Sequence, residues 1–144
     1  MSRPVPLEPA VAARIALARE HLAAGRALTL RAEGHSMWPL IQDGELVVVR
    51  PLERALAVGD VVLVVHAARL VLHRVVRLAP EGVVTKGDSV ARVDGLIALG
   101  DVLGALPRSS PVFHRVVATL SSKAARPLTF VLQRTRLAVS RIGC

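Results

Sequence analysis

The chain has 144 residues, of which 52% are hydrophobic and only 2% aromatic, and its formal net charge is +8. A chain of this length can bury one hydrophobic core, and the scarcity of aromatic side chains excludes the stacking surfaces that single-stranded nucleic-acid binders use. The excess positive charge lies at the end, because residues 108–144 carry seven Lys or Arg and no acidic residue. We therefore expect one globular domain, no nucleic-acid partner and a basic C-terminal tail.

The single cysteine, Cys144, excludes an internal disulfide and a cysteine-based metal site. Residues 1–30 are interrupted by prolines and charges and do not resemble a secretion signal. No stretch approaches the roughly 18 unbroken apolar residues of a membrane-spanning helix. These features predict a cytoplasmic protein, and no metal or organic cofactor is implied.

A proline-rich leader precedes one predicted helix. Residues 11–24 are rich in alanine and carry apolar residues at helical spacing, and Gly25 follows where a helix would end. The next segment, residues 27–32, alternates like a strand, which argues against a helix-turn-helix. We expect the helix to dock on the body of the domain.

The middle of the chain has the pattern of short strands joined by Gly-Asp or Asp-Gly turns. Strands are expected at residues 27–32, 46–50, 61–66, 70–78, 83–86 and 102–106. This spacing predicts a mostly β fold, a coiled antiparallel sheet or small barrel with flanking N- and C-terminal helices. The expected divisions are a leader and helix at 1–26, a mostly β domain at 27–107 and a basic helical tail at 108–144, within which the pattern of residues 126–142 predicts a basic amphipathic helix.

Ser36 has the sequence context of a nucleophile, because it lies at a loop edge between a flexible Gly-His and a bulky Met-Trp-Pro. A serine hydroxyl needs a base to take its proton. His73, within a long apolar strand, is the best candidate, and Lys86 is a rival base. A carboxylate could orient the histidine, and both Asp88 and Asp94 are available, although each could be only a turn residue.

Five segments carry a resemblance to a known family. They are Gly34-His35-Ser36-Met37-Trp38-Pro39, Asp43-Gly44-Glu45, Gly59-Asp60-Val61-Val62, His73-Arg74-Val75-Val76, and Thr85-Lys86-Gly87-Asp88 through Asp94. In this order, over residues 28–106, they resemble the signal peptidase I family in its archaeal and endoplasmic-reticulum-type branch. In that branch a histidine replaces the lysine base of the common bacterial enzymes, and its fold is shared with the self-cleaving repressors of the SOS response.

The resemblance implies roles for individual residues. Ser36 matches the nucleophile, His73 the general base, Asp94 the acidic residue near the base, and Asp88 its companion. Because Gly34 stands where the family often has a serine, the oxyanion is expected to bind backbone N–H groups, including that of Ser36. The apolar residues that follow the serine are expected to contact the substrate; they are Met37, Trp38 and Pro39.

The resemblance implies a soluble serine endopeptidase that cleaves a peptide or protein precursor through Ser36, His73 and Asp94. The alternative is a non-catalytic or self-cleaving regulatory module on the same fold. In either case the basic tail, residues 108–144, can contact an anionic membrane or an acidic partner peripherally.

Overall fold

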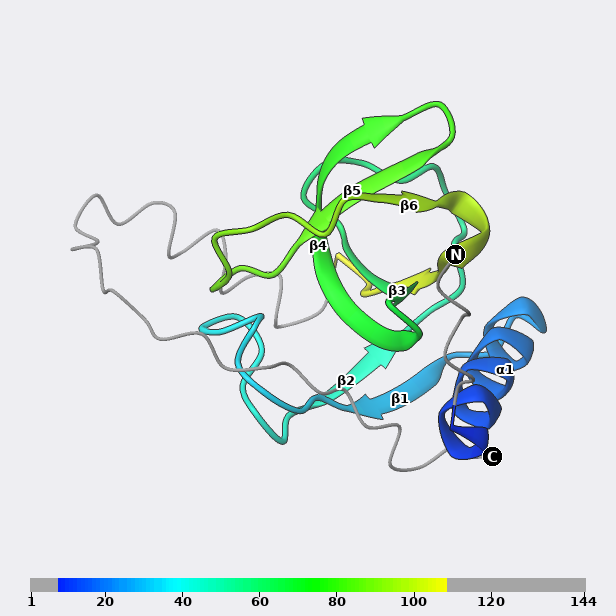
Figure 1. Cartoon of the computed structure of the whole chain (residues 1–144). Coiled ribbons are helices and arrows are strands. Elements are labelled where there is room, and N and C mark those ends of the chain that lie inside the picture. Colours follow the sequence, from blue (N-terminus) through cyan, green and yellow to red (C-terminus); the bar gives the residue numbers. More distant parts are fainter. Residues whose placement is uncertain (1–7, 109–144) are drawn as a thin grey trace, which may run out of the picture.

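The computed structural model describes residues 8–108 and is mostly β, with one helix on the N-terminal side (Figure 1). The helix is α1 (Pro9–Ala23). The strands are β1 (Leu28–Arg31), β2 (Leu46–Val49), β3 (Val61–His66), β4 (Arg69–Ala79), β5 (Gly82–Lys86), β6 (Leu96–Ala98) and β7 (Val102–Ala105), with a 3-10 turn η1 (Leu99–Asp101) before β7. The predicted fold class is confirmed.

The strands form a two-stranded sheet, β1-β2, and a five-stranded sheet in the order β6-β5-β4-β3-β7. All neighbours are antiparallel. Arg50 and Ala105 exchange two backbone hydrogen bonds of 2.9 Å, which join the end of β2 to β7. The long strand β4 curls strongly as it crosses the molecule, so the larger sheet is a half-barrel rather than a flat layer (Figure 1).

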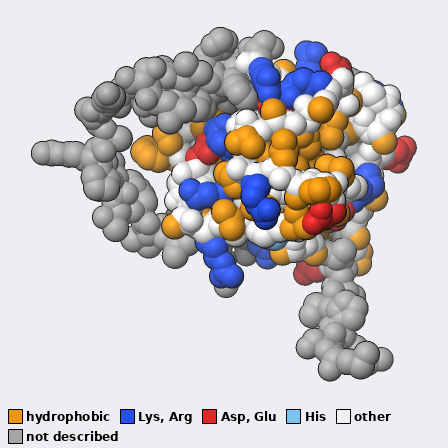
Figure 2. All heavy atoms as spheres, turned by 90° about the horizontal axis from the view of Figure 1, so that it is seen from above, with side chains coloured by type: hydrophobic (Ala, Val, Ile, Leu, Met, Phe, Trp, Pro, Cys, Tyr) orange, Lys and Arg blue, Asp and Glu red, His pale blue; other side chains and the backbone are white. Residues whose placement is uncertain are grey.

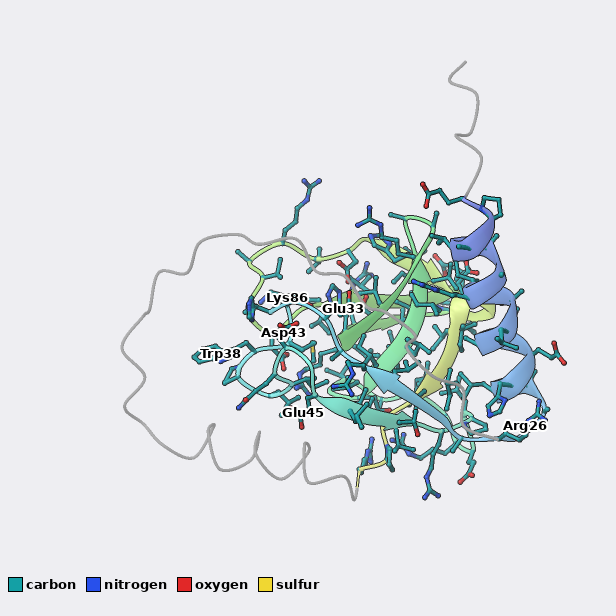
Figure 3. All side chains as sticks on the ribbon, turned by 90° about the horizontal axis from the view of Figure 1, so that it is seen from below. Arg26, Glu33, Trp38, Asp43, Glu45 and Lys86 are labelled. Atoms are coloured by element: carbon teal, nitrogen blue, oxygen red, sulfur yellow. The ribbon has the colours of Figure 1, made fainter. Side chains whose placement is uncertain are left out.

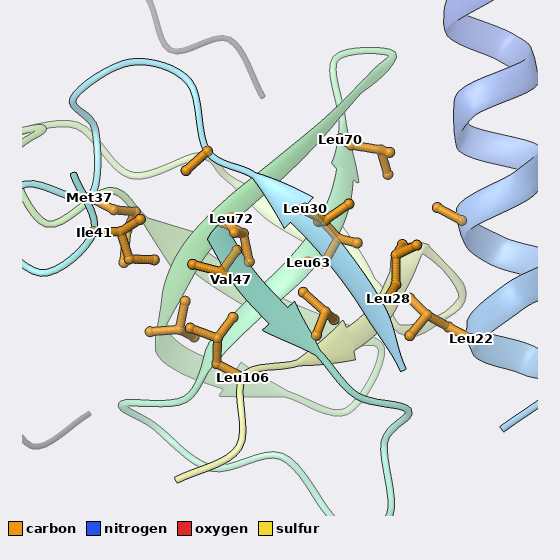
Figure 4. Close-up of a cluster of buried hydrophobic side chains, with 14 of the residues drawn as sticks. Leu22, Leu28, Leu30, Met37, Ile41, Val47, Leu63, Leu70, Leu72 and Leu106 are labelled. Atoms are coloured by element: carbon orange, nitrogen blue, oxygen red, sulfur yellow. The ribbon is translucent and has the colours of Figure 1, made fainter. Parts of the chain in front are cut away.

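Strand β3 lies at the centre of the core because both of its faces are covered. Val61 and Leu63 belong to the cluster that also contains β1, β2 and α1 residues (Figure 4). Val62 and Val64 belong to a second cluster with residues of β4, β5 and β6. Alternate residues of a strand face opposite sides, so an unbroken apolar run such as this one is buried on both sides.

Helix α1 packs through a narrow stripe made by Ile15, Ala18 and Leu22. Its end is closed by Gly25, whose φ of 78° is the left-handed conformation that glycine adopts without strain. The Gly25 N–H donates to the Leu22 carbonyl at 3.0 Å, and the Arg26 N–H donates to the His21 carbonyl at 3.2 Å. This is the Schellman arrangement, and it confirms the helix end predicted from Gly25.

Strands β3 and β4 are joined by a two-residue turn that uses unusual residues. Ala67 and Ala68 have positive φ values of 46° and 62°, which type I′ hairpin turns require. Asparagine and glycine are the residues that usually occupy these positions. Alanine is tolerated here because the paired strands on both sides fix the turn.

The predicted strands all occur, with bounds that differ by one or two residues at some ends. The sequence pattern did not reveal β6 or η1, which are three residues each.

Apolar side chains and cationic side chains share the face seen in Figure 2, and the exposed apolar residues of the sheet include Val76, Leu78 and Leu96. In the part of the chain from residue 8 to 108, no helix is long and apolar enough to cross a membrane. The predicted helix at 126–142 lies outside the described residues, and the division at residues 26 and 107 stays a prediction.

Candidate active site

Ser36 lies in the long loop between β1 and β2. The base of this loop is closed by two backbone hydrogen bonds, from Ala32 N–H to the Glu45 carbonyl at 2.8 Å and from Gly44 N–H to the Ala32 carbonyl at 2.7 Å. Gly34 has a φ of 91°, and its N–H donates to Asp43 Oδ1 at 2.7 Å. The loop therefore has a fixed shape, and within it Ser36 is 3% exposed.

His73 lies on β4, opposite Val62 of β3, and is 6% exposed. Its Nε2 is 3.0 Å from Ser36 Oγ, and its Nδ1 is 2.5 Å from Asp94 Oδ2. Thr85 donates from Oγ1 to the same Asp94 oxygen at 2.7 Å. The structure thus brings together Ser36, His73 and Asp94, which are 37 and 21 residues apart in the sequence.

Strand pairing explains how Thr85 reaches this group. Thr85 on β5 pairs with Val75 on β4, and Val75 lies two residues after His73. Residues two apart on a strand share a face, and directly paired residues share it too. Thr85 and His73 therefore lie on the same face of the sheet, and the loop after β5 brings Asp94 between them.

The surroundings of Asp94 keep its carboxyl group ionised. Burial raises the pKa of Asp94. The hydrogen bonds from His73 and Thr85 and the electrostatic effect of nearby histidines lower this pKa by more than burial raises it, so the net pKa is below the usual value. An ionised carboxylate accepts the His73 Nδ1–H, which leaves the Nε2 lone pair directed at Ser36. This arrangement can remove a proton from the serine hydroxyl.

The loop that follows β5 also holds the backbone of Ser36. The Ser89 N–H donates to the Ser36 carbonyl at 2.9 Å, and Ser89 Oγ donates to the His35 carbonyl at 2.5 Å. A Cβ on Gly87 would lie 2.7 Å from the Ser36 carbonyl oxygen and 3.0 Å from its Cβ. Only glycine fits at residue 87 without moving the serine.

Asp88, the other candidate carboxylate, is bound elsewhere. Both of its oxygens accept hydrogen bonds from Arg74, at 2.8 Å from Nε and 2.7 Å from Nη2. Arg74 Nη1 also donates to the Gly59 carbonyl at 2.8 Å. Among the two carboxylates that the sequence left open, the structure brings Asp94 and not Asp88 into contact with His73.

Lys86, the rival base, directly follows Thr85 on β5 and pairs with Arg74. Because successive side chains of a strand alternate between its faces, the side chain of Lys86 lies on the opposite side from Thr85 and His73. Within residues 8–108 no hydrogen bond joins Lys86 to Ser36, whereas one joins His73 to it.

A small, mostly apolar pocket adjoins Ser36. Its lining consists of Ala32, Glu33, Gly34, Ser36, Met37, Ile41 and Leu72. Of the three residues expected to contact the substrate, Met37 lines the pocket and is buried. Trp38, 40% exposed, lies at the outer end of the loop (Figure 3), and neither it nor Pro39 lines the pocket.

The backbone N–H of Ser36, the expected oxyanion donor, makes no backbone hydrogen bond with another residue of the described range. Backbone N–H groups beside a nucleophile are the usual donors to the oxyanion of a tetrahedral intermediate. In the same range, no group of three or more His, Cys, Asp or Glu side chains is arranged to hold a metal ion.

A comparison with protein families matches residues 4–91 to the family described as peptidase S24-like, which covers more than half of the chain. The chain belongs to the peptidase S24-like family. This membership agrees with the fold expected from the resemblance and indicates, at a coarse level, a serine peptidase-type hydrolase. The matched residues include Ser36 and His73 and end three residues before Asp94. A search of curated proteins and a search of solved structures gave no match.

Three residues of this S24-like site were not identified from the sequence. Thr85 and Ser89 are small hydroxyl residues in the same segment as the candidate carboxylates and Lys86. Arg74 directly follows the candidate base. The nearest signal in the sequence was the position of Thr85, two residues before Gly87. Residues two apart on a strand point to the same side, so Thr85 and Gly87 could face the same site, but this pattern is too common to indicate a role.

Proposed function

We propose that the chain is a signal-peptidase-like serine endopeptidase that cleaves a peptide or protein precursor. The observation that supports this most directly is the continuous set of hydrogen bonds from Ser36 Oγ through the His73 ring to Asp94. Membership in a peptidase family gives independent support for the reaction class. The histidine on β4 favours the Ser-His branch over enzymes with a lysine base.

In the proposed mechanism, Ser36 Oγ attacks the carbonyl carbon of the scissile peptide bond while its proton passes to His73 Nε2. The oxyanion of the tetrahedral intermediate binds the Ser36 backbone N–H. His73 then protonates the amine as the C–N bond breaks, which leaves an acyl ester on Ser36. His73 removes a proton from water as it attacks the ester, and that proton returns to Ser36 Oγ as the acid product leaves.

Asp94 would act on His73 rather than on the substrate. Its carboxylate fixes the tautomer of the ring and stabilises the imidazolium that forms after proton transfer. The Thr85 hydroxyl holds the same carboxylate oxygen and so limits its rotation. In this proposal Asp88 is a positioning residue, since its contact with Arg74 fixes the loop between Gly87 and Ser89.

The substrate is proposed to bind as an extended strand. Strand β1 pairs with β2 on one side only, so its other edge is free in the described sheet. Extended peptides add to such edges through main-chain hydrogen bonds and place alternate side chains in pockets. The small pocket beside Ser36 suits a small apolar side chain just before the cut.

The test compares Ser36→Ala, His73→Ala and Lys86→Ala in peptide cleavage and in labelling by a fluorophosphonate. Loss of a member of a catalytic triad lowers the rate by about three or more powers of ten, so we expect both of the first two variants to be inactive. Lys86→Ala is the matched control and should keep most of the activity. Full activity of His73→Ala, with loss in Lys86→Ala, would assign the base to the lysine.

The self-cleaving alternative predicts a different outcome in the same experiment. The intact mass of the purified chain would then fall with time at a rate independent of its concentration, and Ser36→Ala would stop the change. A chain that keeps its mass but cleaves added peptides supports the endopeptidase. A chain that does neither, and that fluorophosphonate does not label, contradicts both and supports the non-catalytic module on the same fold.

For the location of the protein, we propose a cytoplasmic chain whose basic tail contacts anionic membranes or an acidic partner. The support is the charge of residues 108–144, which include seven cationic side chains and no acidic one. Each cationic residue near an anionic surface contributes about 1 kcal/mol, and salt screens this attraction. Flotation with anionic vesicles should therefore retain the full chain at low salt and release it at high salt.

A further inference from the structure

We propose that Glu33 makes this peptidase prefer substrates with a lysine or arginine immediately before the small residue at the cut. The inference rests on the proposed endopeptidase function and specifies the charge of one substrate residue that this function would favour. Glu33 lies three residues before Ser36 and is one of the residues around the small pocket. Figure 3 places it at the same end of the molecule as Asp43 and Lys86, around the loop that carries Ser36.

The backbone of Glu33 is placed to bind a substrate strand. The N–H and carbonyl of Ala32 are both used in hydrogen bonds to the β2 side, with Glu45 and Gly44. In an extended chain the next residue directs its N–H and carbonyl to the opposite edge. No backbone hydrogen bond of Glu33 is found among residues 8–108, so this edge is open beside the pocket.

The side chain of Glu33 lies on the outer face of that edge. Leu28, Leu30 and Ala32 are buried, and the residues between them, Thr29 and Arg31, are exposed. Glu33 follows the same alternation as Thr29 and Arg31, so its side chain lies on the outer face, where it is half-buried. A peptide added to the edge has the same alternation, so when one side chain enters the pocket, the residue before it faces outward beside Glu33.

The Glu33 carboxylate is available for a new ion pair. Within the described chain it forms no hydrogen bond or ion pair, whereas its charged neighbours are engaged: Asp43 accepts from Gly34, and Arg31 donates to the Gly44 carbonyl at 2.7 Å. A half-buried carboxylate beside an open strand edge attracts a cationic side chain and repels an anionic one. Opposite charges in cross-strand positions change the equilibrium by about two- to fivefold.

The experiment uses the full chain and three peptides that differ at one residue. Each has alanine at the pocket position, preceded by lysine, glutamine or glutamate. We expect kcat/KM to fall from lysine to glutamine to glutamate by about two- to fivefold at each step, and the differences to shrink at high salt. Glu33→Gln should remove the charge preference, and Glu33→Lys should reverse it. Glu81→Gln, a change in the exposed turn between β4 and β5, is the matched control and should keep the preference.

Binding to the Ser36→Ala variant separates this inference from the proposed function. If the wild-type chain cleaves all three peptides equally, the endopeptidase stands and the role of Glu33 is overturned. If no peptide is cleaved, tighter binding of the lysine peptide than of the glutamate peptide, lost in Ser36→Ala combined with Glu33→Gln, still supports the preference. Equal binding, or no binding of any of the three, overturns it.

Discussion

His73 and Arg74 are neighbours on β4, yet they contact two different carboxylates on two different faces of the strand. His73 lies between Ser36 and Asp94, and the His73 and Asp94 side chains are 7% and 12% exposed. Arg74 binds Asp88 and the Gly59 carbonyl, and the side chains of this ion pair are 16% and 21% exposed. The first group contains a ring that can gain and lose a proton, whereas an arginine keeps its charge at all ordinary pH values.

The difference shows how a short segment can provide both chemistry and support. Asp88 and Asp94 are six residues apart in one loop, and each binds one of two adjacent residues on β4. The arginine pair fixes the loop at Asp88, and Gly87 and Ser89 on either side of it contact Ser36. The loop is thereby held close enough for Asp94 to reach the histidine.

The largest effect should come from exchanging the carboxylates of the two groups for amides. Asp94→Asn keeps the shape but lets His73 adopt the wrong tautomer, so we expect kcat to fall by about 10³- to 10⁴-fold. Asp88→Asn should lower kcat far less and should reduce the free energy of unfolding by about 1–3 kcal/mol, because a charged hydrogen bond is lost. Peptide cleavage and urea denaturation measure the two quantities. Equal losses of activity would remove the distinction between the groups.

A second effect should follow from Gly87→Ala, which acts at the junction of the two groups. The new Cβ would lie 2.7 Å from the Ser36 carbonyl oxygen, so the loop or the serine must shift. We expect kcat to fall at least about tenfold, because displacements of about 1 Å in an active site are costly, and the free energy of unfolding to fall by about 1–3 kcal/mol. Gly100→Ala is the matched control, since a Cβ there meets nothing within 4 Å.

A third prediction concerns acid and a different structural carboxylate, Asp60, which is 1% exposed. Burial raises the pKa of Asp60, but hydrogen bonds from Arg54, the Ala57 N–H and Arg108 outweigh it, and the pKa is lowered. A folded pKa below the unfolded value means that this stability is present above the ordinary value of about 3.9 and is lost as the pH falls through the lower, folded value. Asp94 contributes with the same sign.

The measurement for this third prediction is the free energy of unfolding as a function of pH. The wild-type chain should lose stability progressively below about pH 4, and Asp60→Asn should be less stable at neutral pH and less sensitive to acid. Cleavage by Asp60→Asn at neutral pH should stay close to wild type, since Asp60 makes no hydrogen bond to the Ser36–His73–Asp94 group. A steep acid response in Asp60→Asn would assign the effect to other carboxylates.

The smallest effect is expected at the turn between β3 and β4. Ala67 and Ala68 adopt positive φ, which costs an alanine about 1 kcal/mol more than a glycine or asparagine. Ala67→Asn with Ala68→Gly should therefore raise the free energy of unfolding by about 1–2 kcal/mol and leave kcat unchanged. Urea denaturation and peptide cleavage by this variant show whether activity depends on overall stability. A change in kcat would contradict the prediction that it does not.

Most of the fold could be predicted from the sequence because most of its strands are apolar and several of them adjoin Gly-Asp or Asp-Gly turns. Val61–His66 is the clearest case, since an apolar run directly after a Gly-Asp turn has few other interpretations. Leu96–Ala98 was missed because three residues give no periodicity, and its pairing with β5 is decided by tertiary contacts.

The site was predictable in part. The context of Ser36 and the position of His73 indicated the pair, but the choice between Asp88 and Asp94 depended on the path of a loop, which local sequence does not determine. Ser89 and Thr85 gave no specific signal, because small hydroxyl residues occur in most turns and strands. Glu33 was not singled out, since only its place at an open strand edge distinguishes it from other surface carboxylates.

The hydrogen bond from Ser89 to the Ser36 carbonyl has a consequence for biosynthesis. As the chain emerges from the ribosome, the serine and histidine appear first, without the segment that immobilises the serine and without the carboxylate that orients the ring. Both are present only when residues 87–94 have been made and the contacts of Ser89 and Asp94 have formed. In the proposed mechanism, a nascent chain that ends before residue 94 therefore lacks the contacts that activate the serine, and cleavage begins only after β5 and the loop beyond it have been made.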